Sequence, residues 1–131
     1  MIPILVFVLF LSPQAPALPA TESLRSRVEQ LQDKQNTIIR GERLRQREAV
    51  IHFYQARNFT PAWQGRADQI VVAIREIELD GLTPADYHLA AIDALRSASP
   101  TASGRDADLE ILVTDAVSAL VTRCGSGRCG R

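Results

Sequence analysis

Two cysteines and two histidines are the residues of this 131-residue chain that could form a nucleophile and its base. A catalytic cysteine needs a nearby base that stabilises its thiolate. Cys124 and Cys129 lie in the stretch CGSGRCGR, with no histidine near them in sequence. His52 and His88 are expected in helices, and a flexible Gly-rich segment would hold a cysteine poorly against either of them. We therefore predict no catalytic residue and no enzyme activity for this chain.

The same two cysteines are candidates for a disulfide, Cys124–Cys129, which export would permit. Such a bridge closes a very short loop and would order little of the domain. A structural zinc site needs four ligands at a characteristic spacing, which two cysteines and two distant histidines do not provide. We expect no metal and no cofactor, since the sequence also lacks a Gly-rich phosphate-binding loop.

Paired carboxylates could perform acid–base chemistry, but their spacing here is unsuitable. Glu76 and Glu78 are two residues apart, as are Asp106 and Asp108, so on a helix the members of each pair point in different directions. We expect these acids to be helix caps and surface charges.

Charge is unevenly distributed along the chain although the formal net charge is zero. Zero net charge gives no general reason to expect nucleic-acid or membrane binding, and we predict no nucleic-acid partner. The stretch RGERLRQR, residues 40–47, is basic. Its simpler interpretation is a solvated helix face. The alternative is a contact with an anionic partner.

The first twenty residues have the pattern of an exported precursor. IPILVFVLFL is a run of ten uncharged residues, and the small residues of SPQAPALPA follow it. Ten apolar residues are too few to span a bilayer and fit the core of a signal peptide. We predict a signal peptide over residues 1–20, cleavage between Ala17 and Thr21, and a periplasmic or otherwise exported location in a bacterium. An uncleaved signal acting as a membrane anchor is the alternative.

Beyond residue 20 the apolar pattern is helical almost throughout. The spacing of Leu24, Val28 and Leu31 predicts a helix over residues 22–34. The stretch TIIRGERL after it is expected to form a turn or a short extended piece. A second helix is expected to begin near residue 45 and to end at Asn58, because asparagine tolerates the left-handed conformation of a helix stop.

A third helix follows from the apolar stripe of Ile70, Val71, Ile74 and Ile77, and Gly81 is expected to end it in the left-handed conformation.

The next helix begins at once, within DGLTPADY. Thr83 is expected to cap it, with Pro84 at its first position and Asp86 as the reciprocal acid of a capping box. Leu82 and Tyr87 occupy the two positions of a hydrophobic staple.

Ser103 and Asp106 repeat this cap-and-acid spacing before a long helix that is expected to run to about Thr122. No segment alternates long enough to predict a strand. The fold class is therefore all-α: a small bundle of about five short helices with tight capped turns over residues 21–122, preceded by a signal peptide. Residues 123–131 form a Gly/Arg/Cys tail that we expect to be disordered.

Four aromatic rings gather in the stretch FYQARNFTPAW, residues 53–63. We favour a corner of the core at which three elements meet, since each ring can bury on the order of 150–250 Å². An aromatic binding platform is the alternative. The residues that we expect to be structural anchors, here and at the DGLTPADY turn, are Phe53, Tyr54, Phe59, Pro61, Trp63, Gly81, Leu82, Pro84 and Tyr87.

Three stretches in order, RGERLRQREAVIHFYQARNFTPAW, DGLTPADYHLAAIDAL and LEILVTDAVSAL, resemble the scaffold domain of the large bacterial L,D-transpeptidases. These exported enzymes form 3→3 cross-links in peptidoglycan. The residues that carry the resemblance are Gly41, Phe53, Tyr54, Arg57, Phe59, Pro61 to Trp63, Asp80 to Leu82, Pro84 to His88 and Val113 to Ala116. The resemblance covers about residues 24–122, and three ordered motifs make it fairly specific.

The resemblance implies a non-catalytic fragment of a cell-wall enzyme, truncated before a catalytic domain with a Ser-His-Gly-Cys motif. Asn58 stands where the family more usually has glycine, and the sequence after Ala119 departs from the family pattern. The implied partners are peptidoglycan or other modules of such an enzyme. The alternative is an independent periplasmic helical binding or adaptor module, whose basic segment 40–47 contacts an anionic cell-wall or lipid partner.

Overall fold

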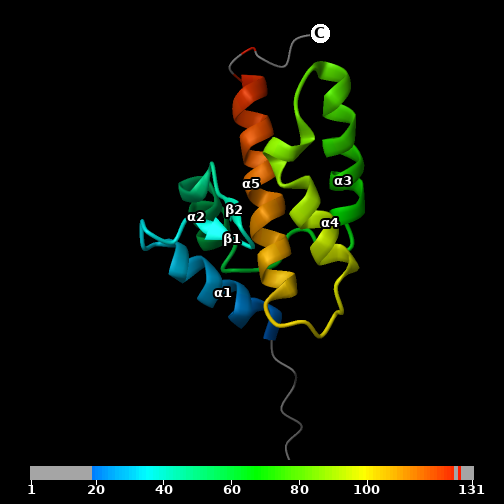
Figure 1. The fold of residues 1–131 in the computed structure, drawn as a ribbon. Helices are drawn as coiled ribbons and strands as arrows, with labels where there is room; N and C mark the ends of the chain where they lie inside the picture. Colours follow the sequence, from blue (N-terminus) through cyan, green and yellow to red (C-terminus); the bar gives the residue numbers. More distant parts are fainter. Residues whose placement is uncertain (1–18, 126, 128–131) are drawn as a thin grey trace, which may run out of the picture.

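A computed structural model describes residues 19–125 and 127 of the chain (Figure 1). The α-helices are α1 (Pro19–Leu31), α2 (Arg47–Ala56), α3 (Ala67–Glu76), α4 (Leu89–Ser97) and α5 (Arg105–Gly125). Two 3₁₀ helices, η1 (Ile77–Asp80) and η2 (Pro84–Tyr87), and two short strands, β1 (Ile38–Ile39) and β2 (Glu42–Arg43), complete the described elements. The predicted all-α class with five α-helices is confirmed.

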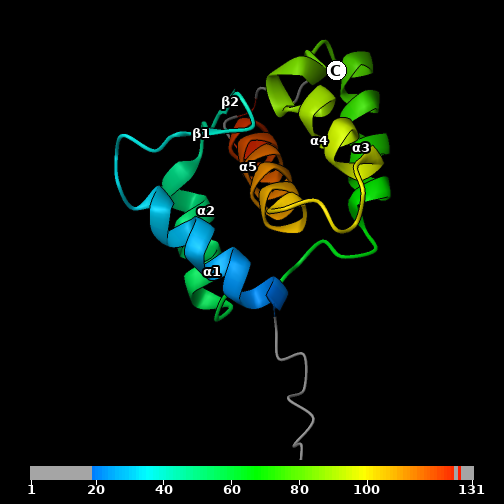
Figure 2. The same cartoon turned by 60° about the horizontal axis from the view of Figure 1, so that its bottom comes forward.

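Helix α5 is the centre of the bundle. Helices α1 and α2 and the hairpin lie on one side of it, and α3 and α4 lie on the other (Figures 1 and 2). Residues 111–116 of α5 are all buried, as expected for a helix surrounded by others. Within residues 19–125 and 127, no helix is long and apolar enough to cross a membrane.

The core is formed by buried apolar side chains from both sides of α5. Its largest fully buried members are Leu24, Val28, Leu31, Val50, Tyr54, Val71, Ile74, Tyr87, Ile92, Ile111, Leu112 and Val113.

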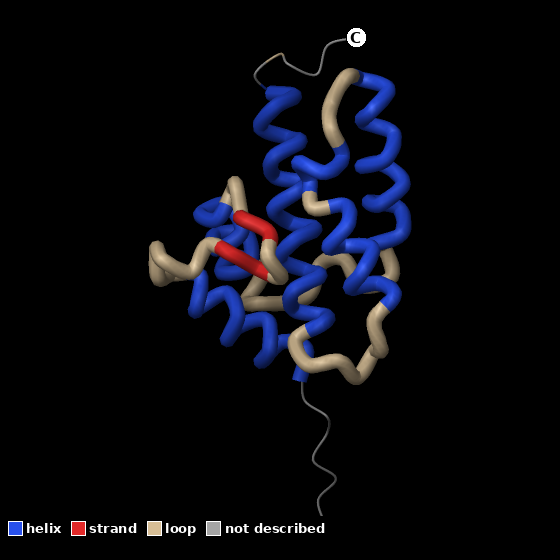
Figure 3. The backbone as a smooth tube through the Cα atoms, viewed as in Figure 1, coloured by secondary structure: helices blue, strands red, loops and turns tan. Residues whose placement is uncertain are grey.

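The stretch TIIRGERL forms a β-hairpin with a two-residue loop, whose strands are the pair of red segments in Figure 3. Ile39 is paired with Glu42 in an antiparallel register. Both turn residues are left-handed, with φ of 51° at Arg40 and 80° at Gly41. Positive φ at both positions is typical of the type I′ turn, whose twist matches that of the strands. The expected short extended piece is confirmed.

Helix α1 begins and ends earlier than the predicted range of 22–34. After Leu31 the chain tightens into i→i−3 bonds, from Gln32 N to Glu29 O (3.1 Å) and from Asp33 N to Gln30 O (3.3 Å). At its other end, the helix includes the last two residues of the predicted signal peptide. Residues 1–18 of that segment lie outside the described residues.

Helix α2 ends as the sequence predicts, in a left-handed turn. Asn58 has a φ of 57°, and Phe59 N donates to Tyr54 O over 2.8 Å. Phe59 is also left-handed, with a φ of 59°, which was not predicted because a bulky residue rarely adopts that conformation. Helix α5 continues to Gly125, beyond its expected end near Thr122.

The left-handed stop is correctly predicted at Gly81, which has a φ of 77°. The α-helix itself ends earlier, at Glu76, and the chain reaches Gly81 through η1. The prediction of a capping box from Thr83 to Asp86 is wrong. The Thr83 side chain makes no capping bond, and Oδ1 of Asp86 instead accepts from Nη2 of Arg45 over 3.1 Å. Pro84–Tyr87 is a single 3₁₀ turn, after which His88 adopts a φ of 62° and α4 begins.

The second predicted capping box is also absent. Helix α5 begins at Arg105, so Ser103 lies one residue too early to cap it, and the carboxylate of Asp106 accepts from Arg105 (2.9 Å) instead. A guanidinium offers several donors and competes well for a short acidic side chain.

We expect Gly81→Ala to lower the free energy of unfolding by about 1–2 kcal/mol, because an L-residue is strained in the left-handed conformation. No atom lies within 4 Å of the added Cβ, so the cost is conformational alone. Urea denaturation followed by circular dichroism measures it. Gly125→Ala is the matched control, because no positive φ is required there and the midpoint should hardly change. An unchanged midpoint in Gly81→Ala would contradict the prediction.

Candidate functional site

Three carboxylates are buried on the central helix α5. Asp108, Glu110 and Asp115 are 0%, 4% and 0% exposed. Burying an ionised carboxylate is costly unless hydrogen bonds or opposite charges compensate it. Each of the three meets such partners, and the partners come from segments far away in the sequence.

Asp108 binds two arginines. Its Oδ1 accepts from Nε of Arg27 on α1 (2.7 Å), and its Oδ2 accepts from Nε of Arg40 in the hairpin turn (2.6 Å). Asp108 therefore connects α1 and the hairpin to the start of α5. The expectation of a surface charge is wrong for Asp108, because these two guanidinium groups compensate its burial. Asp106, Glu76 and Glu78 are exposed, as expected.

Glu110 binds the backbone next to the aromatic stretch. Its Oε1 accepts from Trp63 N (2.9 Å), and its Oε2 accepts from Ala62 N (2.9 Å) and from the Tyr54 hydroxyl (2.7 Å). Burial and the neighbouring Glu110 carboxylate raise the pKa of Tyr54 above its usual range, so the hydroxyl stays protonated. Thr114 completes the network, because its Oγ1 accepts from Nε1 of Trp63 (2.8 Å) and lies 2.7 Å from the Tyr54 hydroxyl.

The four aromatic residues of the stretch 53–63 divide into one buried ring and three half-buried rings. Tyr54 is fully buried, whereas Phe53, Phe59 and Trp63 are half-buried and pack against the core. Phe53 meets Tyr54 edge-on at 5.0 Å and lies nearly parallel to Trp63 at 6.5 Å. The Arg57 guanidinium covers Phe53 at 5.3 Å.

Phe59 is covered in a similar way by the Arg25 guanidinium, at 5.0 Å from its ring centre. Contacts within the chain thus occupy much of the ring surface, which favours a core corner over a binding platform. Of the other expected anchors, Leu82 and Tyr87 are buried, Pro61 and Pro84 are half-buried, and Gly81 is exposed.

The histidines and cysteines do not form a nucleophile–base pair among the described residues. His52 is exposed on α2. His88 is 2% exposed, and its Nδ1 and Nε2 contact Glu42 (3.0 Å) and Asp115 (2.6 Å). Both nitrogens thus have partners already. Cys129, the partner of Cys124 in the expected disulfide, lies outside the described residues.

The basic segment 40–47 is largely engaged within the chain. Arg40 binds Asp108, Arg45 binds Asp86, and Nη1 of Arg47 donates to the backbone oxygen of Leu31 over 2.6 Å. These contacts make the segment part of the fold rather than a free cationic surface.

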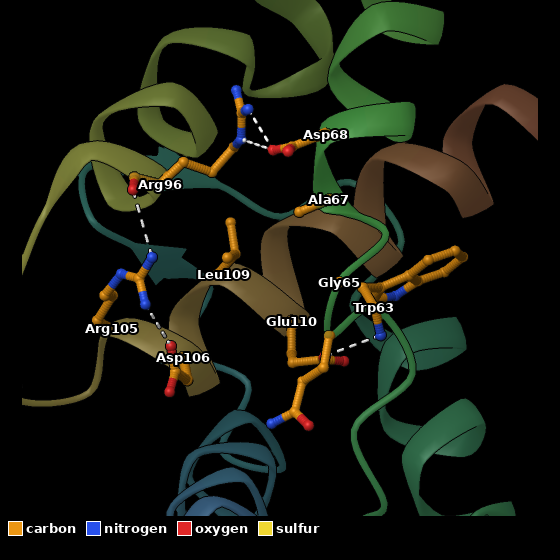
Figure 4. Close-up of a pocket in the computed structure, with 10 residues that line it drawn as sticks. Trp63, Gly65, Ala67, Asp68, Arg96, Arg105, Asp106, Leu109 and Glu110 are labelled. Carbon is orange, nitrogen blue, oxygen red and sulfur yellow. Dashed lines mark hydrogen bonds and ion pairs between the residues drawn. The ribbon is translucent and has the colours of Figure 1, made fainter. Parts of the chain in front are cut away.

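A pocket of about 420 Å³ lies between the segment that precedes α3, the end of α4 and the start of α5 (Figure 4). Its charged side chains all have partners within the chain. Arg96 binds Asp68, Arg105 binds Asp106 and the Arg96 backbone oxygen, and Glu110 binds the Trp63 backbone. The charged groups that line the pocket are thus already engaged within the chain. In the part of the chain that the structure describes, no group of three or more His, Cys, Asp or Glu side chains could hold a metal ion.

We expect Glu110→Gln to lower the free energy of unfolding by roughly 2–3 kcal/mol, since the amide turns an NH₂ group toward donors that the carboxylate satisfied. Chemical denaturation of the two proteins measures the difference. Glu76→Gln is the matched control on an exposed face and should change stability by less than about 0.5 kcal/mol. Equal effects of the two substitutions would show that the Glu110 network does not stabilise the fold.

A family model described as Scaffold domain matches residues 48–130. The match begins in α2 and includes the aromatic corner and helices α3 to α5. It also includes most of the tail, which we expected to depart from the family pattern. Neither the curated proteins nor the solved structures give a match. Because the matched residues make up more than half of the chain, the protein belongs to the Scaffold domain family.

Proposed function

We propose that this chain is the non-catalytic scaffold domain of an L,D-transpeptidase, acting in peptidoglycan cross-linking and cell-wall remodelling. The observation that carries the proposal is the Scaffold domain match over residues 48–130. The order and spacing of three motifs that resemble the transpeptidase scaffold add the specific enzyme class. The partners are then the other modules of a cell-wall enzyme, and peptidoglycan through them.

The contacts of the buried polar groups favour a scaffold role over a catalytic one. Buried carboxylates that could perform acid–base chemistry instead accept hydrogen bonds from Arg27, Tyr54 and the Trp63 backbone. A framework that must hold other modules in place needs such fixed contacts more than it needs free reactive groups.

The alternative, an adaptor that binds an anionic partner through residues 40–47, is less well supported. Arg40, Arg45 and Arg47 already bind groups of the same chain. Using them for a partner would break these contacts.

Export belongs to the same proposal, because the substrate of such enzymes lies outside the cytoplasm. We expect the mature protein to begin between residues 18 and 21, after removal of the apolar segment and its small-residue tail. Intact-mass spectrometry of protein from the periplasmic fraction measures the new terminus. Recovery of a membrane-bound form that retains Met1 would favour the uncleaved anchor.

A domain exchange tests the scaffold role directly. We expect residues 21–125 to restore 3→3 cross-linking when they replace the scaffold of a full-length L,D-transpeptidase, compared with a variant whose scaffold is deleted. The products are measured by mass spectrometry after incubation with a disaccharide-tetrapeptide donor. A chimera that carries Glu110→Gln is the matched control and should lose activity on mild heating. A well-folded chimera without activity would contradict the proposal.

The purified chain alone should form no cross-links, because acyl transfer needs an activated thiolate, a base and oxyanion donors in fixed positions. Cys124→Ala and Cys129→Ala are the controls. Turnover that either substitution abolishes would show that the chain is itself an enzyme.

A further inference from the structure

His88 connects three parts of the fold. It lies between η2 and α4, and its ring reaches Glu42 on β2 with one nitrogen and Asp115 on α5 with the other. The distances are 3.0 Å from Nδ1 to Oε2 of Glu42 and 2.6 Å from Nε2 to Oδ2 of Asp115. The histidine side chain is 3% exposed, so water cannot replace either contact easily.

The two contacts together require a doubly protonated ring. A neutral imidazole has one N–H donor and one lone pair, whereas an ionised carboxylate only accepts. With a neutral His88, one ring lone pair would face a carboxylate oxygen, and that contact would become repulsive. An imidazolium donates to Glu42 and Asp115 at the same time.

The two carboxylates would respond differently to the loss of a proton. Asp115 also accepts from the backbone N–H groups of Arg45 (3.2 Å) and Gln46 (2.7 Å), and its side chain is only 1% exposed. It is therefore held in place and keeps the remaining ring proton. The Glu42 side chain is 33% exposed and can turn to water. The Glu42 contact is thus the one that breaks.

Other charges near the ring do not replace this contact. The Arg45 guanidinium binds Asp86 of η2 over 3.1 Å, and Nη1 of Arg123 on α5 donates to the Tyr87 hydroxyl over 3.3 Å. The N-terminus of α4, where the His88 backbone oxygen accepts from Ile92 N, is weakly positive and opposes ring protonation. The carboxylates of Glu42 and Asp115 are the groups that favour it.

We propose that His88 is a protonation-dependent latch, which fastens the Glu42 end of the hairpin to α5 when the ring is doubly protonated and releases it as the pH rises. Arg40 continues to hold the turn of the hairpin through Asp108. The buried side chain of Ile39 keeps β1 on the core, and the Arg45 and Gln46 backbone stays bound to Asp115. The opening is therefore confined to β2 and to the hydrogen bond from Leu44 N to Thr37 O that closes the hairpin.

The direction of the pH dependence follows from the balance of forces on the ring. Burial lowers the pKa of His88, but the hydrogen bonds and charges of Asp115 and Glu42 outweigh this effect and raise the pKa above its usual range. The contact is then complete below about pH 6.5, the ordinary histidine value, and is lost as the pH rises through the raised value. Within that window the local opening constant should grow about tenfold per pH unit.

Nuclear magnetic resonance of the mature protein between about pH 5 and 9 tests the latch. The ¹⁵N shifts of the His88 ring report whether one or two protons are bound. Hydrogen exchange, corrected for its intrinsic pH dependence, reports the opening of the hairpin at Leu44, whose amide donates to Thr37 O over 2.8 Å. We expect two ring protons at low pH, and a loss of Leu44 protection with the same midpoint as the ring titration.

Glu42→Gln is the decisive variant, because the partly exposed position tolerates substitution and the amide carries no charge. The His88 midpoint should move to lower pH, and Leu44 protection should change less than about twofold across the former window. His52→Gln, on an exposed face, should leave both curves unchanged. A neutral His88 ring throughout the range would overturn the latch. So would Leu44 protection that follows the same pH curve in wild type and Glu42→Gln.

Discussion

The fold depends on the need to satisfy three carboxylates that are buried on one helix. Asp108, Glu110 and Asp115 all lie within the buried part of α5. An unpaired charge there would cost several kcal/mol, a large part of the stability of a small domain. The chain around α5 must therefore bring its donors to these positions. These contacts fix the position of each donor segment against α5, a requirement that hydrophobic burial does not impose.

The two sides of the bundle are held to α5 by different kinds of contact. On the side of α1, α2 and the hairpin, partly buried polar contacts reach α5 from Arg27, Arg40 and the Ala62–Trp63 backbone. On the other side, one buried contact reaches α5, from His88 at the start of α4 to Asp115. There α3 and α4 pack through buried Ile74 and Ile92, and their ion pairs with each other lie nearer the surface. Apolar contacts tolerate small shifts, but a carboxylate that loses a donor does not. The first side therefore has more of the contacts that do not tolerate a shift.

Local rules predicted much of this fold from the sequence. The period of apolar residues gave the helices, and the left-handed stops at Asn58 and Gly81 follow from the conformational freedom of those two residue types. The first capping box failed because a local motif competes with a distant arginine, Arg45, for Asp86. Arg45 is 41 residues away, so no spacing rule within one helix can anticipate that competition.

The buried network was missed for a related reason. The spacing of Asp106 and Asp108 shows that they point apart, but it does not show which of them points inward. The partners of Asp108 are 81 and 68 residues away in sequence, at Arg27 and Arg40. One signal was present, because the stretch DLEILVTDAVSAL leaves little room for a polar face. Acids in a helix that is apolar on nearly every side must find partners inside the protein.

The network also explains how α1 and the hairpin, which together form a peripheral layer, join the family domain. The Scaffold domain match begins at residue 48, so α1 and the hairpin precede it, while all three buried carboxylates lie within it. Arg27 and Arg40 bind Asp108 from outside the matched region, and Glu42 meets His88 within it. The layer is thus attached by charged contacts at two separated points as well as by its apolar residues. The attachment at Asp108 uses arginines, which stay charged at any physiological pH, whereas the attachment at His88 uses a group that titrates. One end of the hairpin is therefore fixed, and the other can respond to the surroundings of the protein.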